Sequence, residues 1–323
     1  MRRAGALLLG IIALAACGAS WLAPNPPNRR FADLLYAPPT RVHIGDGVAM
    51  PHVHPLLIAS RLERRFDEDR SRHVRLTWFS NGVLASADPD NGAPLLVLGA
   101  DAYGRDRFSR LLHGSRATLA LAVLATLFAT LIGAIVGGVA GYAGGWFDSV
   151  LSRASEFIVV LPAIYVTLAL RAVMPLVLPG STIFLLLLAI FALLGWPMVA
   201  RGVRAIVMVE REREYAVAAR AAGASSARLL TRHLLPAASG YLGTQATLLL
   251  PAFILAESTM SYVGLGFPDA TPTWGTMLQD ASNVAMLGDA PWALAPAAAI
   301  FMVVLGVNLL VQSTGRAPVQ LEP

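Results

Sequence analysis

The chain has 323 residues, of which 56% are apolar and 14% are charged, and its mean hydropathy is +0.60. This composition fits a polytopic membrane protein better than a soluble globular domain. The net charge of +5 comes from arginine, because the sequence contains no lysine, and this absence excludes a Walker A nucleotide site and a Schiff-base lysine. The single cysteine, Cys17, excludes an internal disulfide and argues against a metal cluster.

The N-terminal segment predicts a first membrane span. Arg2 and Arg3 precede the uncharged run 4–23, which is long enough to cross a bilayer. The residues up to Cys17 (Leu-Ala-Ala-Cys) also have the form of a bacterial lipoprotein cleavage box. Because apolar residues continue through Ala23, the pattern favours a retained helix over a cleaved signal. Either alternative leaves the next segment outside the membrane.

The segment 24–116 is the one sizeable polar region, and it opens with a proline-rich linker. Ile58, Leu62 and Phe66 recur at helical spacing and predict a surface helix. The alternating residues 74–78, followed by Asn81-Gly82, predict a β-hairpin. We therefore expect a small α+β cap on the outer face.

The cap contains one pair of potential metal ligands. His52 and His54 lie between two prolines, and no further ligand is adjacent in sequence. We therefore expect a loop with a solvent-exposed or hydrogen-bonded pair, and no metal site.

The stretch 98–116 combines an apolar face with a charged one. Its apolar residues are Phe108, Leu111 and Leu112, and its charged residues include Arg105, Asp106, Arg107 and Arg110. This pattern predicts a helix lying at the outer membrane interface, to which we assign no chemistry.

Three further spans are predicted at 117–147, 156–174 and 181–200. Glycines repeat every four residues in the first of them, a pattern that lets a neighbouring helix approach closely; they are Gly133, Gly137, Gly141 and Gly145. Pro162 predicts a kink in the next span, and Arg171 near its outer end could line a water-filled pathway.

The segment 201–236 carries seven arginines and three glutamates, which predicts a cytoplasmic loop. Strong helix formers fill 212–222, where Ala216, Ala219 and Ala222 form one small-residue face. Gly223 is placed to end this helix at positive φ, and Ser225 to cap a second short helix ending at Leu235-Pro236.

The last two spans are predicted at 241–264 and 291–314. Glu257, with Ser261 one helical turn further on, is an ionisable group within the fifth span, and Asn308 is a polar group within the sixth. Such groups either line a pathway or pair with another helix. The external segment 267–289 contains aspartates and no arginine.

These expectations describe an all-α polytopic membrane protein with six spans and both termini inside. The predicted boundaries are a first transmembrane helix at 1–23, the periplasmic region 24–116, a five-helix domain at 117–315 and a cytoplasmic tail at 316–323.

Two stretches resemble ABC importer permeases. The family's cytoplasmic EAA loop is matched by Val217-Ala218-Ala219, Gly223 and the ending 233–236, although Val217 and His233 depart from its usual residues. The stretch 98–116 resembles a second signature of the peptide-permease branch, with Ala100 in place of threonine. The run 214–236 is most similar to that branch's C-type subunit.

The resemblance implies a type I ABC importer permease fold and a coupling helix that docks on an ATPase. The matching positions are Glu214, Tyr215, Ala218, Ala219, Arg220, Gly223, Ala224, Ser225, Arg228, Leu235 and Pro236. Candidate pathway residues are Glu257, Ser261, Arg171 and Asn308. The implied partners are a homologous permease, two ABC ATPases and a periplasmic binding protein in the bacterial inner membrane. This chain would bind no cofactor, with ATP and Mg²⁺ on the partners. The implied cargo is short peptides, with nickel complexes, glutathione-like compounds or opines as alternatives.

The same residues bear on other functions. The flanking apolar runs argue against a DNA-binding helix-turn-helix at 212–235, and an ordinary charged loop would leave the long match unexplained. An intramembrane serine hydrolase is disfavoured because all six histidines fall outside the predicted spans. An ion- or proton-coupled carrier using Glu257 remains the alternative function.

Overall fold

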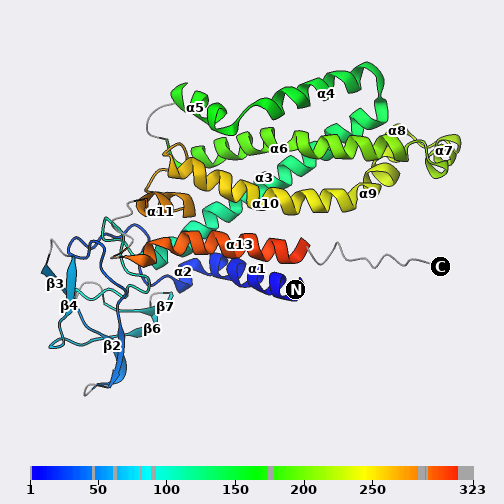
Figure 1. Cartoon of the computed structure of the whole chain (residues 1–323). Coiled ribbons are helices and arrows are strands. Elements are labelled where there is room, and N and C mark those ends of the chain that lie inside the picture. The colour runs from blue at the N-terminus through cyan, green and yellow to red at the C-terminus, as the bar shows by residue number, and fades with distance from the viewer. Residues whose placement is uncertain are drawn as a thin grey trace, which may run out of the picture. The chain divides into compact units, whose positions relative to one another are not determined.

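The computed structural model describes residues 2–45, 48–60, 64–80, 82–88, 92–173, 178–282, 288 and 290–311, and these are mostly helical (Figure 1). The chain divides into two compact units, one formed by residues 1–119 and 258–316, the other by residues 120–257 and 317–323. Helices α3 (Arg107–Ala143) and α10 (Ser239–Tyr262) each contribute to both units.

Four helical segments among the described residues are long and apolar enough to cross a membrane. They are α3, α10, α6 (Gly180–Glu210) and the segment Pro291–Val311, in which a 3₁₀ turn (Pro291–Leu294) leads into α13 (Ala295–Val311). These four correspond to the predicted second, fourth, fifth and sixth spans. Helix α6 continues ten residues beyond the predicted span end at Ala200, so the start of the predicted loop is helical.

The first and third predicted spans are divided into shorter helices. The first consists of α1 (Arg2–Cys17) and α2 (Ala19–Leu22), and the third falls across α4 (Gly145–Val160) and α5 (Ala163–Val173). Pro162 ends α4 instead of kinking one continuous helix, because the residue before a proline is disfavoured in the helical region and Leu161 is extended. Helix length therefore supports four of the six predicted spans.

In the unit formed by residues 1–119 and 258–316, α1 packs along α13. Gly5 and Gly306 allow the approach, since a Cβ built on Gly5 would lie 2.7 Å from the Gly306 carbonyl oxygen. The Arg116 guanidinium donates hydrogen bonds of 2.6 Å to the carbonyls of Ala16 and Cys17, at the end of α1. A cation here satisfies carbonyls that have no partner within the helix.

The same unit contains a β-rich segment with three small antiparallel sheets. Strands β1 (Val42–Gly45), β2 (Val48–Val53) and β5 (Val74–Arg75) form the first, in the order β1-β2-β5. Strands β3 (Leu56–Ser60) and β4 (Arg65–Glu68) form the second, and β6 (Thr77–Ser80) and β7 (Val83–Ser86) form the third. Buried Val53, Leu76 and Leu95 belong to one apolar core, against which Val74 of β5 and Ala85 of β7 also pack.

The β3–β4 hairpin replaces the predicted surface helix. Ile58 and Phe66 are cross-strand partners, both half-buried, and Leu62 lies outside the described residues. The helical prediction was wrong because two apolar residues eight positions apart fit a helical face and a hairpin equally well. Burial decides between the two structures, since it alternates at every residue from Arg65 to Glu68, the period of a strand.

The predicted hairpin at Gly82 is confirmed. Strands β6 and β7 pair from Thr77↔Ser86 to Ser80↔Val83, and Gly82 has φ +76°, while Asn81 lies outside the described residues. The loop expected around His52 and His54 is not observed, because His52 lies within β2 and His54 directly after it. Both are buried and each is hydrogen-bonded to a backbone carbonyl, so the expected pair is the hydrogen-bonded one and not the solvent-exposed one.

In the other unit, the predicted close approach at the glycine series is confirmed for three of its four members. A Cβ built on Gly133 would lie 2.5 Å from Val199 Cβ, and one built on Gly141 would lie 2.6 Å from the Arg204 carbonyl oxygen. Gly137 faces the backbone of Ala200 in the same way. Gly145 begins α4 and faces open space. The glycines therefore let α3 cross α6 at backbone distance.

Helix α4 also packs along α6, where Arg204 forms a two-pronged ion pair with Asp148. The Nη2–Oδ2 distance is 2.6 Å, and the hydrogen bonds from Arg204 hold the pKa of Asp148 below its usual range.

Candidate coupling hairpin and buried charge network

The segment that follows α6 folds into a short helical hairpin, as predicted. It contains α7 (Glu214–Ala221) and α8 (Ser226–Leu229), continued by a π-helical turn (Leu230–Leu234) and α9 (Leu235–Ala237). Figure 1 shows α7 and α8 beyond the end of α6. We refer to residues 211–229 as the coupling hairpin.

Gly223 ends α7 in a Schellman motif. Its φ is +83°, its N–H donates to the Arg220 carbonyl at 2.9 Å, and the Ala224 N–H donates to the Ala219 carbonyl at 3.0 Å. This pair of hydrogen bonds satisfies carbonyls left over at a helix end, and it requires a residue that tolerates positive φ. The predicted conformation of Gly223 is confirmed.

Ser225 caps the second helix. Its backbone is extended, and its Oγ accepts a hydrogen bond of 3.4 Å from the Arg228 N–H. This N-cap, expected from the sequence, fixes the direction in which the chain turns back after Gly223.

The hairpin rests on an apolar cluster built from its own unit. Ala216, Leu229 and Leu234 are fully buried against Val203 and Val207 of α6. Ala219 and Leu235 are partly buried against the same cluster. The predicted small-residue face is therefore used internally at Ala216 and Ala219, because small side chains let α7 lie close to α6.

Polar contacts also fix the hairpin to helix ends. Arg211 donates from Nη1 to the carbonyls of Gly141 and Tyr142 at 2.9 and 3.1 Å, at the C-terminus of α3. The Tyr215 hydroxyl donates to Glu210 Oε2 at 2.7 Å, and Arg220 donates to the Arg211 carbonyl. Movement of the hairpin would therefore be transmitted to α3 and α6.

Small and charged side chains make up most of the exposed surface of the hairpin. Tyr215 and Val217 are 41% and 50% exposed. The remaining exposed positions are Glu212, Arg213, Glu214, Ala218, Arg220, Ala221, Ala222, Gly223, Ser225, Ser226, Ala227 and Arg228, and Pro236 is exposed further on. Apart from the charged residues, most of these side chains are small.

The four candidate pathway residues have different environments. Glu257 is completely buried in α10, Asn308 is exposed on α13, and the side chain of Arg171 in α5 lies outside the described residues. Ser261 is buried, and its Oγ accepts a hydrogen bond from the Phe267 N–H at 3.3 Å. Ser261 thus stabilises the chain turn after α10, and a pathway role for these four residues stays a prediction.

The structure also contains a buried charge network that sequence reasoning missed. Arg105, Asp106, Arg107 and Arg110 were predicted on the exposed face of an interfacial helix, yet none is more than 2% exposed. The prediction was wrong because Asp269, a shared partner of Arg105 and Arg110, lies 164 and 159 residues away from them, where no local pattern reveals it. Phe108 and Leu112, predicted to face the membrane, pack against α2.

Arg105 is the centre of this network. Its Nε donates to Asp101 Oδ2 at 2.6 Å, and its Nη1 and Nη2 donate to the two carboxylate oxygens of Asp269 at 2.6 and 3.0 Å. Arg110 donates to the Asp269 carbonyl at 3.1 Å and to Asn28 Oδ1 at 3.1 Å. The beginning of α3 is thereby fixed to the segment between α10 and α13.

Asp106 caps the beginning of α3. It accepts hydrogen bonds from the Phe108 N–H at 2.9 Å, the Ser109 hydroxyl at 2.6 Å and the Asn25 amide at 2.9 Å. These bonds favour the charged form, but burial outweighs them and raises the pKa of Asp106.

The carboxyls around Arg105 have pKa values shifted in opposite directions. For Asp269, burial raises the pKa, but the hydrogen bonds and charge of Arg105, with the charge of Arg110, outweigh it and hold the pKa below the usual range. Asp280, at the end of α11 (Trp274–Asp280), lies 3.8 Å from Arg105 Nη2. Burial, reinforced by the charge of Asp101, raises the pKa of Asp280 to about 6.

Comparison with known proteins identifies relatives of this chain. Residues 129–316 match the family described as "Binding-protein-dependent transport system inner membrane component". A Brucella ovis protein named as a peptide permease is 37% identical over 213 residues, covering 66% of this chain and 68% of the relative. The dipeptide transport system permease of Alkalihalophilus pseudofirmus is 34% identical over 213 residues, covering 66% and 67%.

Two further comparisons extend this set. The glutathione transport system permease of Escherichia coli is 36% identical over 223 residues, covering 68% of this chain and 71% of the relative. A chain of the MetNI methionine ABC transporter in inward-facing conformations aligns with a TM-score of 0.48 and 18% identity, covering 64% of this chain and 96% of that one. The family match spans the coupling hairpin, and the chain belongs to the inner membrane components of binding-protein-dependent transport systems, the ABC importer permeases.

Proposed function

We propose that this chain is the permease subunit of an ATP-driven importer for short peptides or related small solutes, coupled to its ATPases through the coupling hairpin. The observation that carries the proposal is an exposed hairpin, tied to helix ends, inside the family-matched region. The peptide assignment is supported by the names of relatives, which are permeases for peptides, dipeptides and glutathione. Nickel complexes and opines remain alternatives from the sequence resemblance alone.

Coupling would use the exposed surface from Tyr215 to Arg228 as the docking face. ATP binding on the partner would displace this surface, and the apolar cluster beneath it would transmit the movement to α6 and α10. Rigid connections suit this task, because a helix bundle that rocks between two states can be driven only by a segment that keeps its own shape while it moves. Arg211 provides one such connection to the end of α3.

The complete importer would contain a second, homologous permease, two ABC ATPases and a binding protein on the outer face. In this arrangement the chain has the type I permease fold, six spans and both termini in the cytoplasm of a bacterium. The β-rich segment 42–86 would then lie in the periplasm. ATP and Mg²⁺ would be held by the partner subunits, consistent with a sequence that lacks lysine.

The ion-coupled alternative rests on Glu257 alone. Burial of Glu257 fits helix-to-helix pairing as well as a proton site, and the relatives described above are named as components of permease systems. We therefore advance the importer as the single proposal.

Purification of a tagged copy from its native membranes in mild detergent tests this proposal. The expected result is co-purification of ABC ATPases and a second, related permease. Recovery of a lone protein or a homodimer that is stable without ATPases would contradict it.

A further inference from the structure

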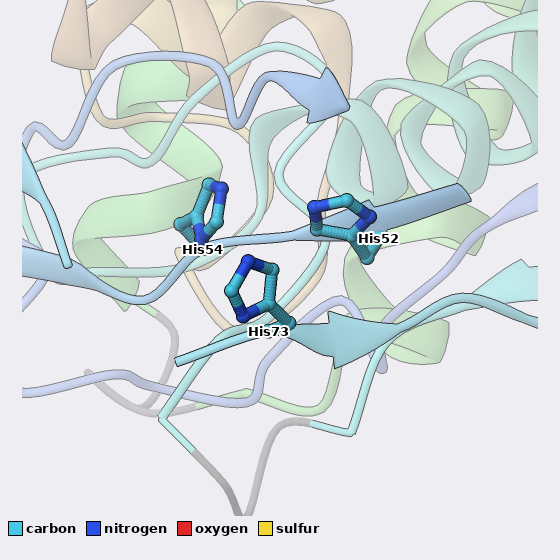
Figure 2. A group of neighbouring side chains, drawn as sticks. All are labelled: His52, His54 and His73. Carbon is cyan, nitrogen blue, oxygen red and sulfur yellow. The ribbon is translucent and has the colours of Figure 1, made fainter. Parts of the chain in front are cut away.

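Four histidines gather on one face of the sheet formed by β1, β2 and β5. His52 and His54 are two residues apart on the path of β2, so their side chains lie on the same face. His43 is the cross-strand partner of His52, and the pairing of His52 with Arg75 places His73 opposite His54. Figure 2 shows the imidazoles of His52, His54 and His73 lying near one another. His52 lies in β2, His54 directly after it, and His73 directly before β5.

Two of these imidazoles are buried and oriented by the backbone. His52 and His54 are 0% and 2% exposed. His52 Nδ1 lies 3.1 Å from the Met50 carbonyl oxygen, and His54 Nδ1 lies 2.9 Å from that of Arg72. Because a carbonyl oxygen can only accept, each Nδ1 carries the proton of the neutral ring, which leaves the lone pair on each Nε2. A backbone carbonyl at one ring nitrogen commonly orients a metal-binding histidine.

The Nε2 atom of His52 is a buried polar atom that the described part of the fold does not satisfy. It is buried and has no hydrogen-bond partner among the described residues. Buried polar atoms of this kind are rare and call for an unseen partner, such as an ion or a water molecule. Because the ring centroids of His73, His54 and His43 lie 4.9, 5.2 and 6.1 Å from that of His52, a metal ion accounts for the lone pair better than a solvent molecule would.

The spacing of the rings fits a metal site. One ligand nitrogen from each of His52, His54 and His73 lies within 4.8 Å of the others. The exposed side chain of His73 can close the remaining distance by a rotation about its own bonds. Next to these three, the His43 ring lies 4.8 Å from that of His54, and His43 Nε2 lies 3.3 Å from Glu68 Oε2.

We propose that His52, His54 and His73 bind a divalent transition-metal ion, with His43 and Glu68 beside it. Imidazole nitrogens suit Zn²⁺, Ni²⁺ and Cu²⁺, whereas Mg²⁺ and Ca²⁺ prefer oxygen ligands. Three histidines leave one position open for His43 or a solvent molecule, as in tetrahedral zinc sites. The ion would join β2 to the chain just before β5 and so stabilise the β-rich segment.

Zinc binding by the full-length protein tests the proposal. We would purify the protein in detergent with a histidine-free tag and in a Cys17→Ser background, which removes the single thiol. Bound Zn²⁺ would be measured by equilibrium dialysis and elemental mass spectrometry, with melting curves recorded with and without zinc. The variants are His73→Ala, the double variant His52→Asn with His54→Asn, and His113→Gln as a control outside the cluster.

The expected result is one Zn²⁺ per chain, a higher melting temperature with zinc, and affinity weakened at least about tenfold by His73→Ala. His113→Gln should bind zinc like the parent, and Mg²⁺ should not compete. Because His73 is exposed, its variant tests the site even if the double variant does not fold. Equal zinc affinity in the parent and in His73→Ala, or no bound zinc in the parent, would overturn the proposal.

Discussion

Gly223 offers the sharpest test of the coupling hairpin. We expect Gly223→Asp to abolish transport while the protein still folds and reaches the membrane. Gly223 has φ +83°, and a Cβ built on it has no heavy atom within 4 Å. The substitution therefore adds backbone strain and a charge to an exposed surface, without a clash inside the chain.

The strain alone is too small to unfold the protein. A left-handed conformation costs an L-residue roughly 1–2 kcal/mol, and less for Asp or Asn, which visit this region more readily than other residues. Folded domains are stable by about 5–15 kcal/mol, so the folded fraction should remain high. Desolvating a carboxylate in a docking groove costs considerably more free energy than this strain. Each ~1.4 kcal/mol of lost binding free energy weakens the association with the partner tenfold.

The assay measures peptide uptake by membrane vesicles, together with the amount of protein in the membrane and the amount of co-purified ATPase. Gly82→Asp is a matched control, because Gly82 has φ +76° and equally open space, but lies in the β6–β7 hairpin. Gly223→Asn separates charge from size and should lose less activity than Gly223→Asp. Normal uptake by Gly223→Asp, or equal losses from Gly223→Asp and Gly82→Asp, would refute the reasoning.

Three further predictions concern stability. Arg105→Ala should destabilise the protein by about 3–5 kcal/mol, because it removes the 2.6 Å hydrogen bonds to the Asp101 and Asp269 carboxylates and leaves them only the more distant guanidinium of Arg110. Thermal denaturation in detergent measures this effect, and exposed Arg65→Ala serves as the near-neutral control. Asp280 has a pKa raised from 3.8 to about 6, so its contribution to stability is fully present below pH 3.8 and is lost as the pH rises through about 6. Asp280→Asn should therefore melt at increasingly higher temperature than the parent from about pH 4 to about pH 7, and a constant difference would contradict the assignment. Gly141→Leu should fail to accumulate in the membrane, because its Cβ would lie 2.6 Å from the Arg204 carbonyl oxygen, whereas Gly243→Leu, with open space, should accumulate normally.

The sequence predicted the elements whose signals are local. The coupling hairpin was predicted because its signals lie in its own residues: a glycine placed for positive φ, a serine placed as an N-cap and an Arg-rich flank. The close crossing of α3 and α6 was predicted because glycines at a spacing of four share one helix face. The four long apolar helices were predicted because length and hydropathy are properties of a single segment.

The remaining features depend on contacts between distant segments. The charges around Arg105 are buried because Asp269 and Asp280 lie beside them, and neither spacing nor composition reveals that pairing. The same holds for the histidines, since His73 lies opposite His54 only through the β2–β5 register. The helix expected near Ile58 was wrong because its apolar spacing also fits cross-strand pairing. Physical contact, not the local pattern, decides each of these cases.

The central claim is that the coupling hairpin contacts an ATPase, and cross-linking from a single site tests it most directly. In a Cys17→Ser background, Ala218→Cys would carry a thiol-attached photo-cross-linker on the exposed face of α7, and Ala59→Cys, exposed on β3, would carry the same probe. After illumination of native membranes, the adducts would be identified by mass spectrometry. We predict an adduct with an ABC ATPase from Ala218→Cys and none from Ala59→Cys. No ATPase adduct from Ala218→Cys, or the same adduct from both positions, would contradict the account.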